Sequence, residues 1–335
     1  MNSRVTLQDV ADAAGVSIGS ASRALHGRGA SPAMAECVTR TAELLGYQAD
    51  VTGRALRTRR SFEIAVMVAD IGNPAYVQMM QAVHEVVADA GYQVLVASTG
   101  DSGKSIASGV RSLSSGFVDG LVLAPLWVDD DLVKTLGECP VPVVVASRIE
   151  GSADLDSVSV DSAAGVALAV DHLVNRGRSR LAFINGPLES VAGNRRRQGF
   201  EQSLAKHGLT ATGIQIADDF TMKGGALAAN RLIERLDGQL DAVVAANDLL
   251  AIGCIQALSA QGLRVPDDVA VTGMDNTELG EVISPSLTSV DLRAWERGRQ
   301  AALLLLDRIN GEGGAVRRML VEPQLFVRDS TGGSE

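Results

Sequence analysis

The chain has 335 residues, of which 46% are apolar and only 3% aromatic, and its formal net charge is −10. This length is enough for more than one domain. No apolar run approaches the roughly 18 residues of a membrane span, and no charged-then-apolar leader opens the chain, so we expect a soluble, cytoplasmic protein. Three widely spaced cysteines fit neither a disulfide framework nor a zinc site. We expect Cys37, Cys139 and Cys254 to be reduced and mostly buried.

The amino-terminal stretch predicts a helix-turn-helix. A first helix has one apolar face at helical spacing, and Gly15 then ends it in a tight turn. Ser17 is a suitable N-cap for a second helix, because its hydroxyl can accept an early backbone N–H. The residues expected to face inward on these two helices are Leu7, Val10, Ala11, Ala14, Ala21, Ala24 and Leu25.

A third helix is predicted from about Pro32 to Leu45, with Val38, Ala42 and Leu45 turned toward the other two. The three helices give a small core, and the exposed hydroxyls and arginine of the second helix suit phosphates and base edges. A small helical docking domain is the alternative reading of the same apolar stripes.

Charge favours DNA binding over docking. Residues 1–60 carry eight arginines against five acidic residues, a net charge of +3, while the remaining residues carry 22 basic against 35 acidic residues, a net charge of −13. A basic head on an acidic body is the pattern expected when only the head meets a polyanion.

Several motifs resemble the LacI/GalR family of bacterial transcription repressors. The headpiece and hinge of that family resemble VTLQDVADAAGVS at 5–17, ASRAL at 21–25, GY at 46–47 and RALRTRRS at 54–61. The resemblance extends over nearly the whole chain, because family-like markers follow in the family's order: DIGNPAY, VDGLVLAP, NGP…RRRQGF, AANDLLAIG, GLRVPDDVAVTGMDN and SPSLTSV.

This resemblance implies an all-α helix-turn-helix headpiece followed by an α/β periplasmic-binding-protein-like body of two doubly wound lobes. The expected headpiece spans 1–48, the hinge 49–61 and the body 62–335. Within the body, the first lobe is expected at about 62–160 and 292–318, and the second at about 161–291 and 319–330. The implied DNA contacts are Thr6, Ser17, Ile18, Gly19, Ser20, Ser22, Arg23, His26, Arg54, Leu56 and Arg57.

The hinge segment has two open readings. Its arginine pairs and few apolar residues suit a solvated linker, whereas in the family the segment forms a helix on DNA and a leucine wedges into the minor groove. Leu56 matches that leucine. Gly53 stands where the family often has alanine, and a mid-helix glycine costs about 0.5–1 kcal/mol relative to alanine. We therefore expect this hinge to order less readily.

From Phe62 onward, short apolar runs alternate with amphipathic segments, the pattern of parallel α/β lobes. Strands are predicted at 62–70, 92–98, 120–125 and 141–147, and again at 180–186, 241–248 and 269–275. Helices are predicted near 74–90, 103–115, 129–137, 162–176, 190–207, 223–236 and 247–262. A last helix near 292–310 and one strand near 318–328 should return across the hinge between the lobes.

Polar residues follow the predicted strand ends, where parallel sheets bind ligands. Carboxylates, amides and arginines pair with vicinal hydroxyls, and aromatic faces cover a sugar ring. By resemblance, the effector-contacting positions are Asp70, Asn73, Tyr76, Arg148, Arg196, Phe220, Asn247 and Asp275. Ser147 and Leu292 depart from the family's frequent Asp and Gln, which suggests a ligand with fewer hydroxyls than ribose.

Each of these residues also has a structural reading. Asn247 would suit the cap of a helix beginning at Asp248, and Asp275 would suit an ordinary turn. Arg196 belongs to an arginine triplet that could be a solvated helix face, and Tyr76 and Phe220 could be core residues.

TGDSGKS at 99–105 ends like a phosphate-binding P-loop, but Ser98 occupies the position where the motif needs a glycine. No nucleophile–base pair is visible, and the four histidines lack metal-ligand spacing. We therefore expect neither an enzyme, a bound metal nor a cofactor. A secreted sugar-binding protein would lack the basic head and begin with a signal peptide.

The sequence thus predicts a repressor of carbohydrate genes. It should bind double-stranded DNA at a pseudopalindromic operator as a homodimer, with a monosaccharide or derivative as effector and no membrane partner. Induction is favoured over corepression. The alternative is a corepressor-activated regulator of a non-sugar pathway, such as nucleoside or purine metabolism.

Overall fold

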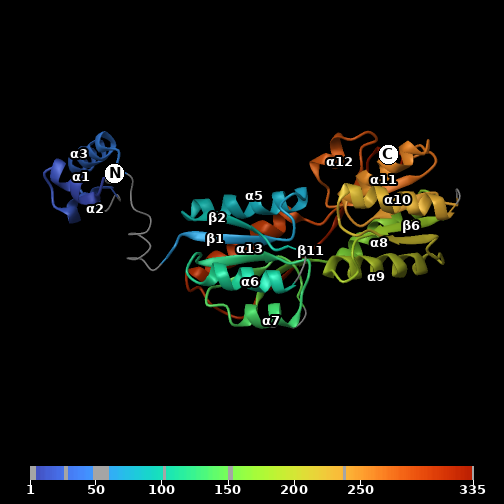
Figure 1. Cartoon of the computed structure of the whole chain (residues 1–335), viewed down its shortest axis with the longest axis horizontal. Helices are drawn as coiled ribbons and strands as arrows, with labels where there is room; N and C mark the ends of the chain where they lie inside the picture. Colours follow the sequence, from blue (N-terminus) through green and yellow to red (C-terminus); the bar gives the residue numbers. More distant parts are fainter. Residues whose placement is uncertain are drawn as a thin grey trace. The chain divides into compact units, whose positions relative to one another are not determined.

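The computed structural model describes residues 5–25, 29–47, 60–100, 103–149, 154–236 and 239–333. Contacts divide the chain into two compact units, Met1–Ser61 and Phe62–Glu335, and each is described by itself (Figure 1). No helix among the described residues is long and apolar enough to cross a membrane.

The described residues of the first unit form the helices α1 (Leu7–Ala13), α2 (Ile18–Leu25) and α3 (Pro32–Leu45), which agree with the predicted helix-turn-helix. Caps define their ends. Thr6 and Asp9 form a reciprocal capping box on α1, Ser31 caps α3, and Gly46 ends α3 in the left-handed conformation. The buried core consists of small aliphatic residues: Val10, Ala11, Ala21, Ala24, Val38 and Ala42.

Two burial predictions in this unit were wrong. Leu45 is 39% exposed, because it is the last residue of α3 and Tyr47, two residues later, packs against the core instead. Cys37 lies on the exposed side of α3, whereas Cys139 is half-buried and Cys254 is buried. Burial raises the pKa of the Cys254 thiol to about 12, so this thiol stays protonated at neutral pH.

The body has two lobes, each built on a six-stranded sheet. The first sheet is entirely parallel, in the order β11-β5-β4-β3-β1-β2. Its strands are β1 (Glu63–Val68), β2 (Gln93–Ser98), β3 (Gly120–Ala124), β4 (Val143–Val145), β5 (Asp156–Val160) and β11 (Arg318–Val321). Separate apolar clusters cover its two faces. One lies under α5 (Pro74–Asp89) and α13 (Ala294–Ile309), the other under α6 (Gly103–Ser114) and α7 (Asp130–Gly137) (Figure 1).

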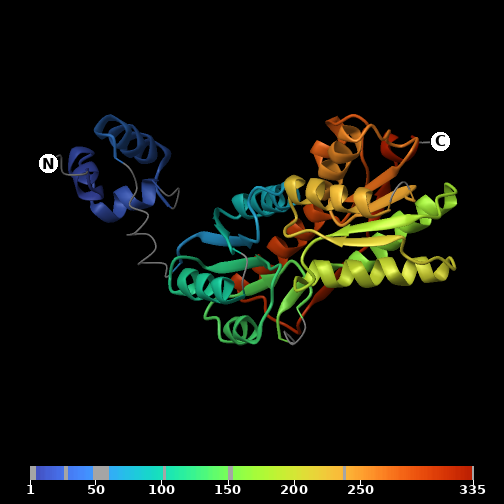
Figure 2. The same ribbon diagram turned by 45° about the vertical axis from the view of Figure 1, so that its right-hand side comes forward.

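The second sheet has the order β12-β10-β9-β8-β6-β7, and only β12 is antiparallel to its neighbour. Its strands are β6 (Leu181–Asn185), β7 (Gly213–Ile216), β8 (Ala242–Ala245), β9 (Ala270–Met274), β10 (Thr288–Asp291) and β12 (Gln324–Phe326). Its helices are α8 (Ser162–Asn175), α9 (Val191–Lys206), α10 (Met222–Leu236), α11 (Asp248–Ala260) and the short α12 (Glu278–Val282). Figure 2 shows helices on both faces of this sheet as well.

The chain crosses between the lobes three times, after β5, after β10 and after β11. The prediction of one strand near 318–328 was wrong: β11 pairs with β5 in the first sheet, and β12 pairs with β10 in the second. The last crossing therefore follows Val321, later than the predicted boundary between 318 and 319. The predicted strand is thus divided into β11 and β12, and each forms the edge of a different sheet.

Close packing of α10 against α11 depends on glycine. A Cβ built on Gly253 would overlap the carbonyl oxygen of Met222, and a Cβ on Gly225 would overlap that of Leu250. Backbone atoms cannot yield as a flexible side chain can, so the two helices approach this closely only without side chains at the crossing.

We expect Gly253→Ala to lower the free energy of unfolding of the body by about 1–3 kcal/mol through overpacking. Gly137, also in a helix, has nothing within 4 Å of its hypothetical Cβ. Gly137→Ala is therefore the matched control and should be neutral or slightly stabilising. Denaturant unfolding of both variants tests the difference, and equal midpoints would contradict it.

Candidate functional site

The exposed face of α2 carries polar side chains linked in a row. The Ser17 Oγ accepts the Ser20 backbone N–H at 3.1 Å and lies 2.9 Å from the Ser20 Oγ. One Arg23 Nη donates to the Ser20 Oγ at 3.2 Å. Ile18, which is 49% exposed, adds an apolar side chain. This row presents hydroxyls, one guanidinium and one aliphatic group on a single helix face.

The other predicted DNA contacts differ in how far the structure describes them. Thr6 is exposed, and its hydroxyl is engaged with Asp9 in the cap of α1. Gly19 and Ser22 lie half-buried on α2. Four predicted contacts lie outside the described residues: His26, Arg54, Leu56 and Arg57.

In the body, a cavity of about 620 Å³ lies between the two lobes. Its walls come from strand ends of both sheets and from the crossings after β5 and β10, where Ser162 and Leu292 lie. All eight residues predicted to contact an effector line it: Asp70, Asn73, Tyr76, Arg148, Arg196, Phe220, Asn247 and Asp275. The two departures from the family pattern, Ser147 and Leu292, line it too.

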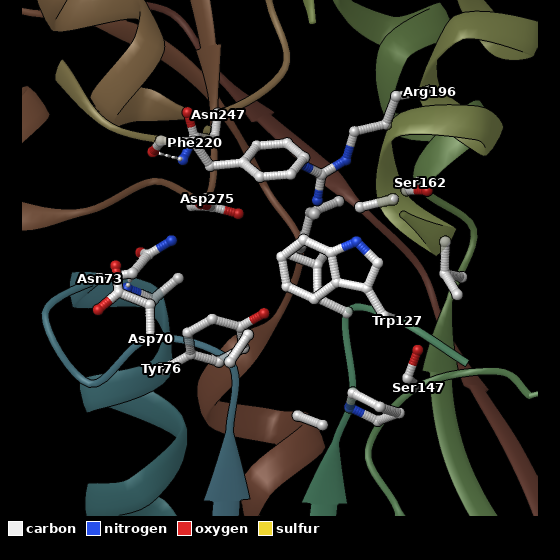
Figure 3. Close-up of a pocket in the computed structure, with 18 of the residues that line it drawn as sticks. Asp70, Asn73, Tyr76, Trp127, Ser147, Ser162, Arg196, Phe220, Asn247 and Asp275 are labelled. Atoms are coloured by element: carbon white, nitrogen blue, oxygen red, sulfur yellow. Dashed lines mark hydrogen bonds between the residues drawn. The ribbon is translucent and has the colours of Figure 1, made fainter. Parts of the chain in front are cut away.

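Figure 3 shows how these groups divide the cavity. Asp70, Asn73 and Asp275 lie on one side, and Ser147 and Ser162 lie on the other. The rings of Tyr76, Phe220 and Trp127 lie between them, with Arg196 reaching in from α9. The arrangement combines polar groups for hydroxyls with aromatic faces for an apolar ring surface.

Arg196 is 9% exposed, and one Nη donates to the carbonyl oxygen of Ala246 at 2.6 Å. Its Nε is buried and has no hydrogen-bond partner within the described part of the chain. Burial lowers the pKa of Arg196, while the nearby Asp275 carboxylate and the Tyr76 phenol oppose that shift. Arg196 therefore brings a guanidinium to the cavity wall near a carboxylate, a pair that suits vicinal hydroxyls of a ligand.

Asp275 follows β9 and is 8% exposed. Burial raises the pKa of its carboxyl group to about 7; Asp248 and Asp291 add to the rise, while Arg196 and Arg297 oppose it. Burial also raises the pKa of Tyr76 to about 12, with a further contribution from Asp275. At neutral pH the Tyr76 phenol therefore stays protonated, and Asp275 is poised between its two forms.

The cavity also contains residues that sequence reasoning missed. Trp127 lies three residues after β3, so the rule that strand ends carry ligand contacts was sufficient to find it. Arg297 lies inside α13, where no such rule applies. Its guanidinium donates to the carbonyl oxygens of Ala146 and Leu292, each at 3.0 Å, and faces Tyr76 and Asp275.

Some residues of the cavity wall also have the structural role that the sequence suggested. Asn247 caps α11, since its Oδ1 accepts the Leu250 N–H at 2.9 Å, and its amide nitrogen donates to the Phe220 carbonyl oxygen at 3.1 Å. Asn73 caps α5 in the same way. The solvated-face reading holds for Arg197, which pairs with Glu201 at 3.0 Å, but not for the buried Arg196.

The raised pKa of Asp275 predicts a pH-dependent stability. The folded carboxyl group has a pKa of about 7 against an ordinary value of 3.8, so the folded state binds more protons between these values. The free energy of unfolding should therefore fall as pH rises from about 4 to about 7 and remain low above that. Below about pH 4 both states are protonated, and the effect vanishes.

We expect Asp275→Asn to raise the melting temperature of the body at pH 8 and to change it little at pH 4, because the variant removes a buried charge. Thermal unfolding of both proteins across this range is the measurement. A change in melting temperature that is equal at both pH values would contradict the assignment.

Within the described ranges, no three His, Cys, Asp or Glu side chains gather closely enough to hold a metal ion.

Comparison with known proteins identifies the architecture. A family model for a periplasmic binding protein-like domain matches residues 170–331. The chain is 36% identical to the HTH-type transcriptional regulator CelR of Thermobifida fusca over 98% of each protein. It is 30% identical to the HTH-type transcriptional repressor CytR of Escherichia coli K12 over 97% of this chain and 96% of that protein.

Solved structures agree. A CelR–cellobiose complex matches with a TM-score of 0.74 and 35% identity, covering 98% of this chain and all of the other. The lac repressor dimer bound to operator and the anti-inducer ONPF matches with a TM-score of 0.87 and 26% identity, covering 98% and 99% of the two chains. Because these matches cover nearly the whole chain, headpiece and body together, the chain belongs to the LacI family of helix-turn-helix transcriptional regulators.

Proposed function

We propose that this chain is a transcription repressor whose binding to a pseudopalindromic operator is controlled by a small saccharide in the interlobe cavity. The observation that carries the proposal is the cavity wall, in which side chains from both lobes converge on one polar and aromatic site. The headpiece is joined to this body in one chain and carries a polar, arginine-bearing helix face suited to DNA.

The chemistry of the cavity supports a saccharide. A carboxylate and guanidinium groups, on Asp275, Arg196 and Arg297, offer paired acceptors and donors to vicinal hydroxyls. Phe220 from the second lobe and Trp127 from the first each offer a ring face. The volume of about 620 Å³ lies within the range of about 300–1,000 Å³ usual for small-molecule sites. Either a monosaccharide or a disaccharide would fit this description, and the cellobiose bound to CelR makes that sugar the first candidate. Cellobiose has more hydroxyls than ribose, so this choice departs from the expectation drawn from Ser147 and Leu292 and rests on the CelR complex.

Exposed apolar surface supports a homodimer. The edge strand β2 exposes Leu95 and Val96, and α12 exposes Leu279 and Val282, the latter at 78%. Long edge strands with exposed apolar residues are normally covered by another chain or element. A second copy would match the two-fold symmetry of a pseudopalindromic operator, as in the lac repressor dimer on its operator.

Control follows from contacts that both lobes make with one ligand. A saccharide touching residues of both lobes binds closed and open bodies differently, so it shifts their populations. If only one arrangement places two headpieces on the same operator, ligand and DNA share one equilibrium, with a coupling of about 1–3 kcal/mol or roughly 5–150-fold. We expect induction, in which the saccharide weakens operator binding.

A DNA-binding titration of the full chain on the DNA upstream of its own gene tests the proposal. Two chains should bind per operator, affinity should fall steeply with salt, and cellobiose or glucose should weaken binding. A parallel titration with adenosine tests the alternative of a nucleoside effector. If neither sugar changes operator affinity but adenosine does, the saccharide assignment is wrong, and binding that ignores salt would contradict the basic head.

A further inference from the structure

A buried carboxylate lies directly behind the cavity wall. Asp248 is the first residue of α11, and its side chain is fully buried. It accepts three hydrogen bonds: from the Thr277 N–H at 2.7 Å, from the Thr277 hydroxyl at 2.8 Å and from the Ser289 hydroxyl at 2.5 Å. Burial raises its pKa to about 6, and these hydrogen bonds hold the shift down. Burying a carboxylate whose hydrogen-bond donors are mainly neutral costs free energy of folding. This cost points to a role for Asp248 other than stabilising the fold.

The segment held by this carboxylate carries Asp275. Asp275 has φ +117° and Asn276 has φ +53°, two consecutive non-glycine residues in the left-handed half of backbone space. Such conformations persist only where the surroundings enforce them. Here the Asn276 N–H donates to the Ser289 Oγ at 3.0 Å, and Arg328 donates to the Asn276 Oδ1 at 2.7 Å.

The hydrogen bonds of Asp248 therefore hold the segment from Asp275 to Thr277 in place. Thr277 is bound through both its N–H and its hydroxyl. These two bonds oppose a change of Asp275 and Asn276 to negative φ angles. Ser289 bonds Asp248 and Asn276 at once. The chain neighbour of Asp248 is Asn247, another residue of the cavity wall, and Figure 3 shows Asn247 and Asp275 on the same part of that wall.

We propose that Asp248 is the positioning residue of the effector site: through Thr277 and Ser289 it fixes the strained segment that aims the Asp275 carboxylate into the cavity. This inference rests on the proposed function of the cavity. Asp248 does not line the cavity, so it acts on the effector through Asp275 and not by direct contact. The same bonds fix the start of α12, because Thr277 directly precedes that helix.

Two substitutions test this role, one at each partner of the hydrogen bond between Asp248 and Thr277. Asp248→Asn replaces one acceptor oxygen by a donor, and Thr277→Val removes the hydroxyl while keeping the side-chain shape. Calorimetric titration of the full-length variants with cellobiose should show at least a tenfold rise in Kd for each. Thr277→Ser keeps the hydroxyl and should bind within threefold of the wild type.

Asp241→Asn is the matched control. Asp241 directly precedes β8, whereas Asp248 lies beyond the other end of that strand, and the Asp241 carboxylate also accepts hydrogen bonds, from the backbone N–H groups of Ser179 and Arg180. Its loss should lower stability without changing the Kd for cellobiose. An equal loss of affinity in Asp241→Asn and Asp248→Asn would reduce the role of Asp248 to general stability and overturn the inference.

Hydrogen exchange gives a readout that needs no ligand. Amides of residues 275–282 should exchange faster in Asp248→Asn and Thr277→Val than in the wild type, and at wild-type rates in Thr277→Ser and Asp241→Asn. Unchanged exchange and unchanged Kd in the first two variants would refute the positioning role. If the wild type itself binds no saccharide, the proposed function fails instead, and the exchange rates still decide whether Asp248 holds the segment.

Discussion

Arg196→Met is expected to abolish the response to the saccharide while leaving operator binding intact. Arg196 lines the cavity and its charge interacts with the Asp275 carboxylate, so a ligand hydroxyl in the cavity can bond to its guanidinium. A hydrogen bond to a charged group contributes about 1.5–3 kcal/mol, which corresponds to roughly 10–150-fold in Kd. The headpiece carries none of the altered contacts, so DNA affinity without sugar should be unchanged.

The next residue, Arg197, supplies the control variant. Arg197 lies on the same helix but is paired with Glu201 on the exposed side. Arg197→Met removes the same charge and a similar side chain, yet it should keep the wild-type Kd for cellobiose in calorimetry. If Arg196→Met also binds cellobiose with wild-type affinity, the cavity has been assigned to the wrong ligand or the wrong residues.

Arg23→Ala is expected to lose operator recognition more than general DNA affinity. Arg23 is exposed on α2, and its bond to Ser20 holds its guanidinium on the helix face that we propose to contact DNA. A good contact from arginine to a base edge contributes about 1–3 kcal/mol of discrimination. We therefore expect roughly 5–150-fold weaker operator binding and a much smaller change on unrelated DNA.

Arg40→Ala is the comparison for charge alone. Arg40 is exposed on α3 and makes no contribution to the row on α2. Its loss should weaken operator and unrelated DNA by the same small factor. A fall in affinity after Arg23→Ala that is equal on both DNAs would show that Arg23 contacts phosphate rather than bases.

Sequence reasoning located the cavity in two ways: parallel strands end at a common edge, and the resemblance to the family named the contacting positions, including Arg196 within α9. Apolar runs such as those of β1, β3 and β8 identified the strands, and the polar residues just beyond them were brought to one cavity. Trp127 follows the same logic. The rule needs the strand ends, which apolar runs mark locally, and parallel pairing, which the alternation of strands and helices along the chain indicates.

Other features depend on tertiary partners that no local pattern encodes. The strand β5 reads DSVSV, with too few apolar residues to be recognised alone, and it forms because β4 and β11 lie on either side of it. Arg297 reaches the cavity from within a helix because α13 follows the second crossing between the lobes. The left-handed segment at Asp275 and Asn276 is likewise imposed by Asp248, Ser289 and Arg328, which are distant in sequence from one another.

Reciprocal linkage between the two sites tests the central claim most directly. If a saccharide in the cavity weakens operator binding by some factor, operator DNA must weaken saccharide binding by the same factor. The measurement is the Kd for cellobiose of the full-length protein, free and saturated with its operator, beside the operator Kd with and without cellobiose. We predict two equal ratios of roughly 5–150-fold. A cellobiose affinity that is identical in the free and operator-bound protein would contradict the account.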